Sequence, residues 1–278
     1  LRLLMLIKKR NIDLFNIFIG LIISSCFFFF PVEALALTGR EIMQQVLDRD
    51  DGDDGTSDME MVLIDKKGRQ RIRKMRSFSK DFGEDTYSVI FFLAPADVKN
   101  TGFLTYDYKK SGKDDDQWLY LPALRKNKRI ASSDKSGSFM GSDFNYSDMT
   151  ETDLDDFNYK LMKEVAVEDH KTWQIEVLPK NDDVADDTGY SKSIVFVRQD
   201  NYVPIRGVKW VYKSKKMKYM KVNKMKVIDN IWVVTDSQMA TKQGRKTVHS
   251  TILRISNVKF NQDLKEEFFA LRQLEKGL

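Results

Sequence analysis

Apolar and polar residues alternate with a period of two over much of the chain, which is the pattern of β-strands with one buried face. Met59, Met61 and Leu63 share one face of the first candidate strand, and Lys66-Lys67-Gly68 marks the turn that ends it. Turn signals then recur at intervals of roughly 8–12 residues, which favours an antiparallel meander over β-α-β units. The further strand candidates are residues 69–80, 87–93, 102–108, 117–121, 159–167, 171–178, 191–198, 203–212, 217–227, 231–239 and 246–258.

Two segments carry the longer apolar period of amphipathic helices. Thr38-Gly39-Arg40-Glu41 has the capping-box pattern and precedes an apolar stripe at helical spacing over residues 42–47. Near the end of the chain, Asp263-Leu264-Lys265-Glu266 repeats the capping pattern before the apolar residues of 268–274. We expect this second helix to dock on the sheet, because its apolar face is too hydrophobic to remain in water.

Polar segments interrupt the strands. Residues 50–58 form an acidic, Gly-containing loop whose Asp spacing does not fit a calcium EF-hand. Residues 126–149 are rich in Ser, Gly and Lys, and the acidic stretch 150–157 has room for a short helix. Within the longer segment, Gly137 and Gly141 bracket two apolar residues, Phe139 and Met140. The pattern suits a lid over a cavity or a membrane-touching tip, and it equally suits a loop that packs onto the sheet.

The first 36 residues have the three parts of a secretory signal peptide. The basic cluster Lys8-Lys9-Arg10 precedes an apolar run from Leu14 to Val32 and the small residues of Ala34-Leu35-Ala36. We therefore expect cleavage after Ala36 and a single exported domain over residues 37–278. Because the apolar run is longer than usual, retention as a membrane anchor is one alternative, and lipidation at Cys26 is another.

Composition restricts the chemistry available to the mature chain. Cys26 is the only cysteine, so residues 37–278 offer no thiol nucleophile, disulfide or cysteine metal site. We expect His170 and His249 to be lone exposed side chains, since they are far apart in sequence. No phosphate-binding glycine loop, nucleophile elbow or zinc spacing occurs, so we expect neither catalysis nor a cofactor. Solvated charge is the expected role of the carboxylate runs in polar turns, at residues 114–116, 155–156, 182–183 and 186–187.

Charge does not indicate a nucleic-acid-binding protein. The formal net charge is +5, and it falls to about +3 without residues 1–36. The densest basic stretch is Lys213–Lys226, in which seven lysines are interleaved with Met, Tyr and other residues. This stretch could contact anionic lipid or phosphate, or it could be a solvated strand pair whose lysines discourage edge-to-edge pairing.

Several short motifs, in a fixed order, give the chain a resemblance to a known family. They are residues 118–122 (WLYLP) with Arg129-Ile130, residues 137–144 (GSFMGSDF), residues 176–180 (EVLPK), residues 202–204 (YVP) and residues 268–271 (FFAL). With these motifs after an N-terminal helix, the chain resembles the LolA-like outer-membrane lipoprotein-sorting proteins of Gram-negative bacteria. The resemblance implies a mainly β (α+β) fold, in which a strongly curved antiparallel sheet forms an unclosed barrel and helices plug its concave face.

The resemblance also implies a function. It indicates a periplasmic carrier that binds a lipid or the acyl chains of a lipoprotein in an apolar cavity, for transport or sorting to the outer membrane. The implied partner is an inner-membrane transporter of the RND type, and we expect a monomer that binds no nucleic acid. The candidate cavity or lid residues are Phe103, Trp118, Phe139, Met140 and Phe144. Replacing Phe139 and Met140 with Ser is expected to weaken lipid retention without unfolding the protein.

Two other functions fit the same sequence. One is a non-catalytic envelope scaffold that docks on an RND-type transporter through residues 135–144. The other is an envelope hydrolase, for which Asp143 is the best candidate carboxylate because it lies inside the most specific motif.

Overall fold

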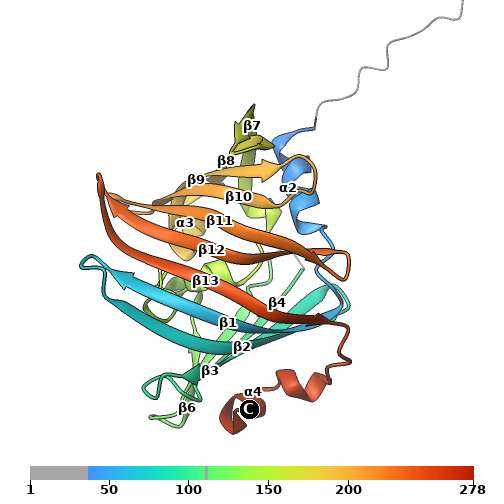
Figure 1. The fold of residues 1–278 in the computed structure, drawn as a ribbon, viewed down its shortest axis with the longest axis vertical. Helices are drawn as coiled ribbons and strands as arrows, with labels where there is room; N and C mark the ends of the chain where they lie inside the picture. Colours follow the sequence, from blue (N-terminus) through green and yellow to red (C-terminus); the bar gives the residue numbers. More distant parts are fainter. Residues whose placement is uncertain (1–36, 110–111) are drawn as a thin grey trace, which may run out of the picture. The chain divides into compact units, whose positions relative to one another are not determined.

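One curved sheet makes up most of the protein. The structure is a computed structural model that describes residues 37–109 and 112–278, so the predicted signal peptide lies outside the described residues. The sheet has 13 strands in the order β6-β5-β4-β3-β2-β1-β13-β12-β11-β10-β9-β8-β7, and every neighbouring pair is antiparallel. It curves strongly without closing, and β6 and β7 are its two edges (Figure 1). The predicted unclosed antiparallel barrel is confirmed.

The strands follow the predicted meander, with shifts at their ends. The strands from the middle of the sheet to its β6 edge are β1 (Asp54–Asp65), β2 (Gln70–Phe82), β3 (Asp85–Ala94), β4 (Gly102–Asp107), β5 (Asp116–Leu121) and β6 (Lys126–Ile130). The others are β7 (Phe157–Val167), β8 (His170–Pro179), β9 (Tyr190–Arg198), β10 (Pro204–Val211), β11 (Lys216–Ile228), β12 (Ile231–Gln243) and β13 (Lys246–Phe260). Strand β6 is not predicted from the sequence, because its five residues are mostly charged and show no apolar alternation.

The N-terminal helix forms as predicted. Helix α2 (Gly39–Leu47) begins at a complete capping box, in which the Thr38 hydroxyl accepts from the Glu41 N–H and the Glu41 carboxylate accepts from the Thr38 N–H. Its Ile42 is fully buried against β8 and β9. A Cβ on Gly39 would lie 2.8 Å from the backbone nitrogen of Leu161, so glycine is what lets α2 lie this close to β7.

Three predictions of local structure are wrong. The second capping box does not form, because the C-terminal segment folds as a 3₁₀ turn, η5 (Glu266–Phe269), followed by α4 (Leu271–Lys276) with no side-chain cap. Helix α3 (Asp182–Thr188) replaces a predicted polar turn, since the Asn181 side chain accepts from the Val184 N–H and caps it. The acidic loop is shorter than predicted, because β1 already begins at Asp54.

Both faces of β3–β5 are buried, against different parts of the chain. Phe92, Phe103 and Leu119 point to the concave face, where they pack with the segment that follows β6. The residues that alternate with them along these strands, such as Phe91 and Leu104, point to the convex face. There they pack against η5 and α4, with Phe269 and Leu274 at the centre of the cluster. Helix α4 therefore lies outside the barrel, as Figure 1 shows, rather than among the elements that fill it. No helix in residues 37–109 and 112–278 is long and apolar enough to cross a membrane.

Candidate functional site

The concave face of the sheet is covered by one irregular segment of the chain. Residues 131–156, here called the plug, run from edge strand β6 to edge strand β7. The plug contains four short 3₁₀ turns: η1 (Ser132–Asp134), η2 (Phe139–Gly141), η3 (Tyr146–Met149) and η4 (Leu154–Asp156). Because both ends of the plug continue into edge strands, the plug spans the open side of the barrel.

Apolar side chains of the plug fill the inside of the barrel. Phe139 is only 1% exposed, and its ring centroid lies 5.0 Å from that of Phe103 and 6.3 Å from that of Phe92. Tyr146 meets the Phe139 ring edge-on at 5.6 Å. The half-buried Met140, Phe144 and Met149 pack on the same cluster, which includes Met61, Leu63 and Met75 of the sheet. The plug thus covers the concave face of the sheet with apolar contacts.

Four of the five residues predicted to form the cavity or lid come together. Phe103, Phe139, Met140 and Phe144 belong to one cluster on the concave face. Trp118 lies on the convex face instead, where it meets Tyr106 edge-on at 5.0 Å beneath the C-terminal segment. Phe139 adopts the second of the two arrangements that the sequence allows, a loop packed onto the sheet. Lipid contact by any of the five stays a prediction.

The tip of the plug has an unfavourable backbone conformation. Met140 has φ of +50°, in the left-handed region that non-glycine residues rarely adopt, and Gly141 follows with φ of +75°. The Met140 carbonyl accepts a hydrogen bond from the Arg73 guanidinium of β2, which helps to hold this conformation. Gly137 has a different role, because a Cβ there would lie 2.9 Å from the Asp134 carbonyl oxygen.

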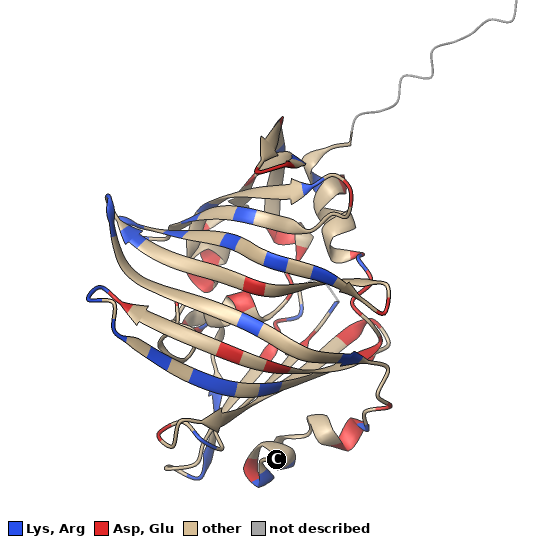
Figure 2. Ribbon diagram, in the orientation of Figure 1, with Lys and Arg blue, Asp and Glu red and all other residues tan. Residues whose placement is uncertain are grey.

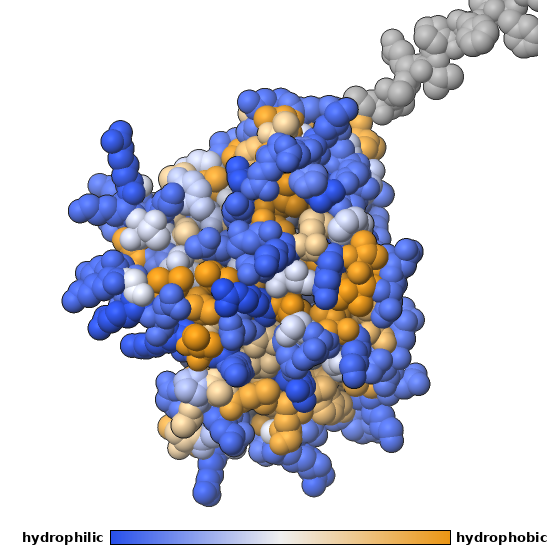
Figure 3. All heavy atoms as spheres, viewed as in Figure 1, coloured by the Kyte–Doolittle hydropathy of each residue, from blue (hydrophilic) through white to orange (hydrophobic). Residues whose placement is uncertain are grey.

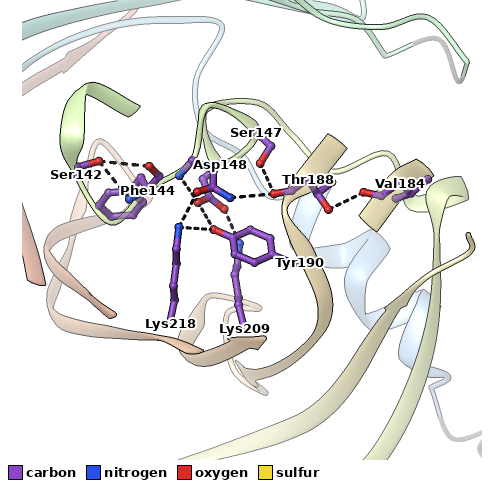
Figure 4. A network of polar contacts seen from close by, with 10 residues as sticks. Ser142, Phe144, Ser147, Asp148, Val184, Thr188, Tyr190, Lys209 and Lys218 are labelled. Atoms are coloured by element: carbon purple, nitrogen blue, oxygen red, sulfur yellow. Dashed lines mark hydrogen bonds and ion pairs between the residues drawn. The ribbon is translucent and has the colours of Figure 1, made fainter. Parts of the chain in front are cut away.

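A buried charge network fixes the second half of the plug to the sheet (Figure 4). The carboxylate of Asp148 accepts from the Lys209 ammonium at 2.6 Å, from the Tyr190 hydroxyl at 2.6 Å and from the Asn145 N–H at 2.8 Å. Burial by itself would raise the pKa of Asp148, but the Lys209 charge and these hydrogen bonds together lower it. The Asn145 and Ser147 side chains also donate to the Thr188 carbonyl at the end of α3.

Lys218 of β11 completes this network. Its ammonium donates to the Asn145 side-chain oxygen at 2.6 Å and to the Tyr190 hydroxyl at 3.2 Å. Burial lowers the pKa of Lys218 to about 8, although the nearby Asp148 carboxylate opposes that shift. The lysine-rich stretch Lys213–Lys226 is therefore not a wholly solvated strand pair, because one of its lysines points inward. Strand β11 is also interior to the sheet, so its lysines do not protect an edge.

A second polar anchor holds the first half of the plug. The Asp143 side chain, 2% exposed, accepts from the Thr241 hydroxyl at 2.5 Å and from the Thr251 hydroxyl at 2.7 Å. His249 Nδ1 lies 2.7 Å from the same carboxylate. The expectation that His249 is a lone exposed residue is therefore wrong. All the carboxylate's contacts connect the plug to β12 and β13, which indicates a structural role for Asp143 rather than a catalytic one.

The sheet residues of these anchors form a polar row across four neighbouring strands. Lys209, Lys218, Thr241 and His249 are successive cross-strand partners on β10, β11, β12 and β13. Sequence reasoning missed this row, since each residue looks ordinary within its own strand. The available signal was an inward-facing polar residue at the same register in four strands, and it becomes visible only when the strand pairing is known.

A separate cleft of about 440 Å³ opens beside the plug and is strongly acidic. It gathers carboxylates from all four runs that the sequence places in solvated turns, and it adds Asp107 and Glu151. Burial, followed by the Asp115 charge, raises the pKa of Asp107 to about 7, and burial also raises the pKa of Asp115. Such a lining does not suit an acyl chain. Within residues 37–109 and 112–278, no group of three His, Cys, Asp or Glu side chains is placed to hold a metal ion.

Known proteins share this architecture. A family model described as an uncharacterized protein matches residues 84–276. A DUF1329 family protein from Desulfovibrio piger is 30% identical, with a TM-score of 0.77 over 85% of this chain and 97% of that one. A proposed outer membrane lipoprotein-sorting protein domain from Vibrio parahaemolyticus has the same identity and TM-score over 85% and 98% of the two chains. No curated protein matches the chain.

A third structure shows how widely the fold extends. A LolA superfamily protein from Nitrosomonas europaea is 17% identical, with a TM-score of 0.64 over 86% of this chain and 100% of that one. An unclosed antiparallel barrel with a filled concave face is thus the LolA-like fold, and the resemblance predicted from the sequence is confirmed. At 30% identity over nearly all of the Desulfovibrio chain, the protein belongs to the DUF1329 family, and it shares the fold of the LolA superfamily protein.

Proposed function

We propose that the protein is a non-enzymatic carrier of the bacterial envelope, which binds a lipid or the acyl chains of a lipoprotein against the concave face of its sheet. One observation carries this proposal: the apolar interior is closed by an irregular segment rather than by a second sheet or a long helix. The similarity to a proposed outer membrane lipoprotein-sorting domain supports it. Sorting toward the outer membrane and loading by an inner-membrane RND-type transporter are finer parts of the same proposal.

The energetics of an acyl chain explain why such an interior is needed. Exposing an acyl chain to water costs about 0.8 kcal/mol per CH₂, so a chain of about sixteen carbons costs roughly 12 kcal/mol. The interior must therefore be nearly as apolar as a bilayer. Met61, Met75 and the plug residue Met140 suit this task, because methionine adapts to ligands of different shape. In the proposed cycle, cargo takes the place of plug side chains on the sheet.

The first test is native mass spectrometry of the protein purified from a bacterial periplasm, followed by organic extraction. A co-purifying mass of lipid size is the expected result, and it would begin to identify the cargo. An empty protein that also takes up no added phospholipid or lipopeptide would overturn the proposal.

Met140→Ser tests whether the plug tip contacts the cargo. Because Met140 is half-buried at the end of the apolar cluster, Ser should reduce retained lipid several-fold while the fold persists. Met162→Ser is the matched control, since Met162 is 44% exposed on β7. Equal lipid retention in both variants would remove Met140 from the proposed site. Phe139→Ser is less suitable, because emptying this fully buried position costs about 3–5 kcal/mol and would lower stability together with lipid retention.

The scaffold function is the second candidate, and the filled interior favours it. Phe139 and its neighbours bury their apolar surface against one another, as a protein that never binds lipid would require. Cross-linking in cells distinguishes the two functions. A scaffold should remain attached to a single transporter, whereas a carrier should contact components of both membranes.

A further inference from the structure

Basic side chains gather in three turns at one end of the barrel. In an antiparallel meander, successive turns lie at alternate ends, so the β1–β2, β10–β11 and β12–β13 turns share one end. These turns are also neighbours, because Asp65 pairs with His249, and Gln243 pairs with both Lys246 and Lys216. Every one of the three is rich in Lys and Arg.

We call this end the basic rim. It consists of nine exposed side chains: Lys66, Lys67, Arg69, Arg71, Lys213, Lys215, Lys216, Arg245 and Lys246. Among the residues that the structure describes, only two of the nine form an ion pair, Arg69 with Asp65 and Lys213 with Asp186. Figure 2 shows Lys and Arg at these turns, and Figure 3 shows hydrophilic side chains projecting from the same end. Most of this positive charge is therefore free to act on a partner.

Several turns at the opposite end of the barrel are acidic. The β2–β3 turn carries Glu84 and Asp85, the β7–β8 turn carries Glu168 and Asp169, and the β4–β5 connection, which also holds Lys109 and Lys113, ends in residues 114–116, which are all Asp. The β8–β9 connection at the rim end is acidic too, since α3 contains four aspartates, so the positive charge belongs to the three turns of the rim rather than to the whole end. A local concentration of positive charge would still orient the molecule as it approaches a charged surface.

From this arrangement we propose that the basic rim docks the protein on an anionic phospholipid membrane, with the strands pointing toward the bilayer. Six of the nine residues are lysines, whose hydrated point charges suit a diffuse layer of phosphate headgroups better than paired carboxylates on a protein. Exposed apolar side chains accompany the charge: Ile72 beside the rim is 47% exposed, and Leu124 in the β5–β6 turn at the same end is 62% exposed. Basic and apolar side chains together are typical of an interfacial contact.

Docking in this orientation would bring the plug close to the membrane. Arg73, two residues from the rim residue Arg71, bonds the carbonyl of Met140 at the plug tip. His249, three residues from Lys246, contacts Asp143 of the plug. The membrane contact does not depend on the proposed carrier function, because it is defined by headgroup charge and needs no cargo.

Vesicle sedimentation tests the proposal with the exported protein. The probes are vesicles of mixed phosphatidylglycerol and phosphatidylcholine and vesicles of phosphatidylcholine alone, at about 0.05 M and about 0.5 M salt. The test variant is Lys66→Glu with Lys67→Glu, at turn positions whose side chains make no ion pair. The control is Lys224→Glu with Lys226→Glu, which changes the net charge equally on exposed positions of β11 away from the rim.

We expect the protein to bind the vesicles that contain phosphatidylglycerol and not those of phosphatidylcholine alone. The higher salt concentration should abolish this binding. Each basic residue near an anionic surface is worth about fivefold in affinity, so the rim variant should bind at least about 25-fold more weakly, while the control should change little. Equal weakening in both variants would attribute binding to net charge and overturn the proposal. Failure to bind anionic vesicles would also overturn it. Rim-dependent cross-linking to a protein in cells would then identify an acidic protein surface as the partner instead.

Discussion

At the scale of single residues, the plug is held by polar contacts that no local sequence pattern predicts. Asp143 and its partners on β12 and β13 are about a hundred positions apart in sequence. Asp148 lies 42 positions from Tyr190 and 61 from Lys209. The motif in residues 137–144 did indicate that Asp143 matters, but it suggested a hydrolase as one explanation. The strand register supplies the better one: a carboxylate of the plug meets a polar row across four strands.

Asp143→Ala should destabilise the protein by about 2–4 kcal/mol, because two buried hydroxyls and His249 lose their shared acceptor. Urea unfolding gives the free energy. Asp134→Ala is the matched control in the same segment, since Asp134 makes only an exposed ion pair with Lys128, and this change should cost less than about 0.5 kcal/mol. Similar losses in both variants would show that the anchor contributes little.

At the scale of elements, the apolar alternation predicted nearly all of the sheet, since strands with one buried face produce this pattern. Segments whose structure depends on tertiary contacts were missed or misplaced. Strand β6 is too polar to show alternation, and α3 is a short helix built largely of aspartates. The C-terminal capping pattern failed because Asp263 adopts φ of +53° and the chain turns before the helix begins. The side chain of Trp118 looked like part of the cavity, but the parity of β5 places it on the convex face.

Docking of α4 on the convex face predicts a marked difference between two leucines of one helix. Leu274 is fully buried against β4, so Leu274→Ala should cost about 2–4 kcal/mol through the cavity that it leaves. Leu271 is 37% exposed, and Leu271→Ala should cost less than about 1 kcal/mol. Thermal unfolding of the two variants provides the comparison. If both leave the melting temperature unchanged, the helix is not docked in solution.

At the scale of the whole molecule, the acidic cleft makes stability depend on pH. The native pKa of Asp107 is about 7, so the folded protein binds a proton that the unfolded chain releases above its ordinary pKa near 4. This group therefore stabilises the fold at low pH, and the contribution falls as pH rises from about 4 to 7. Asp107→Asn should consequently raise the unfolding free energy more at about pH 8 than at about pH 5, by about 1–2 kcal/mol. Urea unfolding at the two pH values measures this, and a pH-independent effect would contradict it.

The path of the plug from one sheet edge to the other has a consequence for selectivity. A segment tethered at both ends competes with every incoming molecule for the same apolar surface, and it does so at an effective concentration in the millimolar range that dilution cannot reduce. In the proposed carrier, weakly apolar molecules would then lose to the chain itself, and only a ligand with enough CH₂ groups to bury would displace it. The tethered plug would thus set a minimum length of acyl chain that binds, and the sequence of the plug would determine that length.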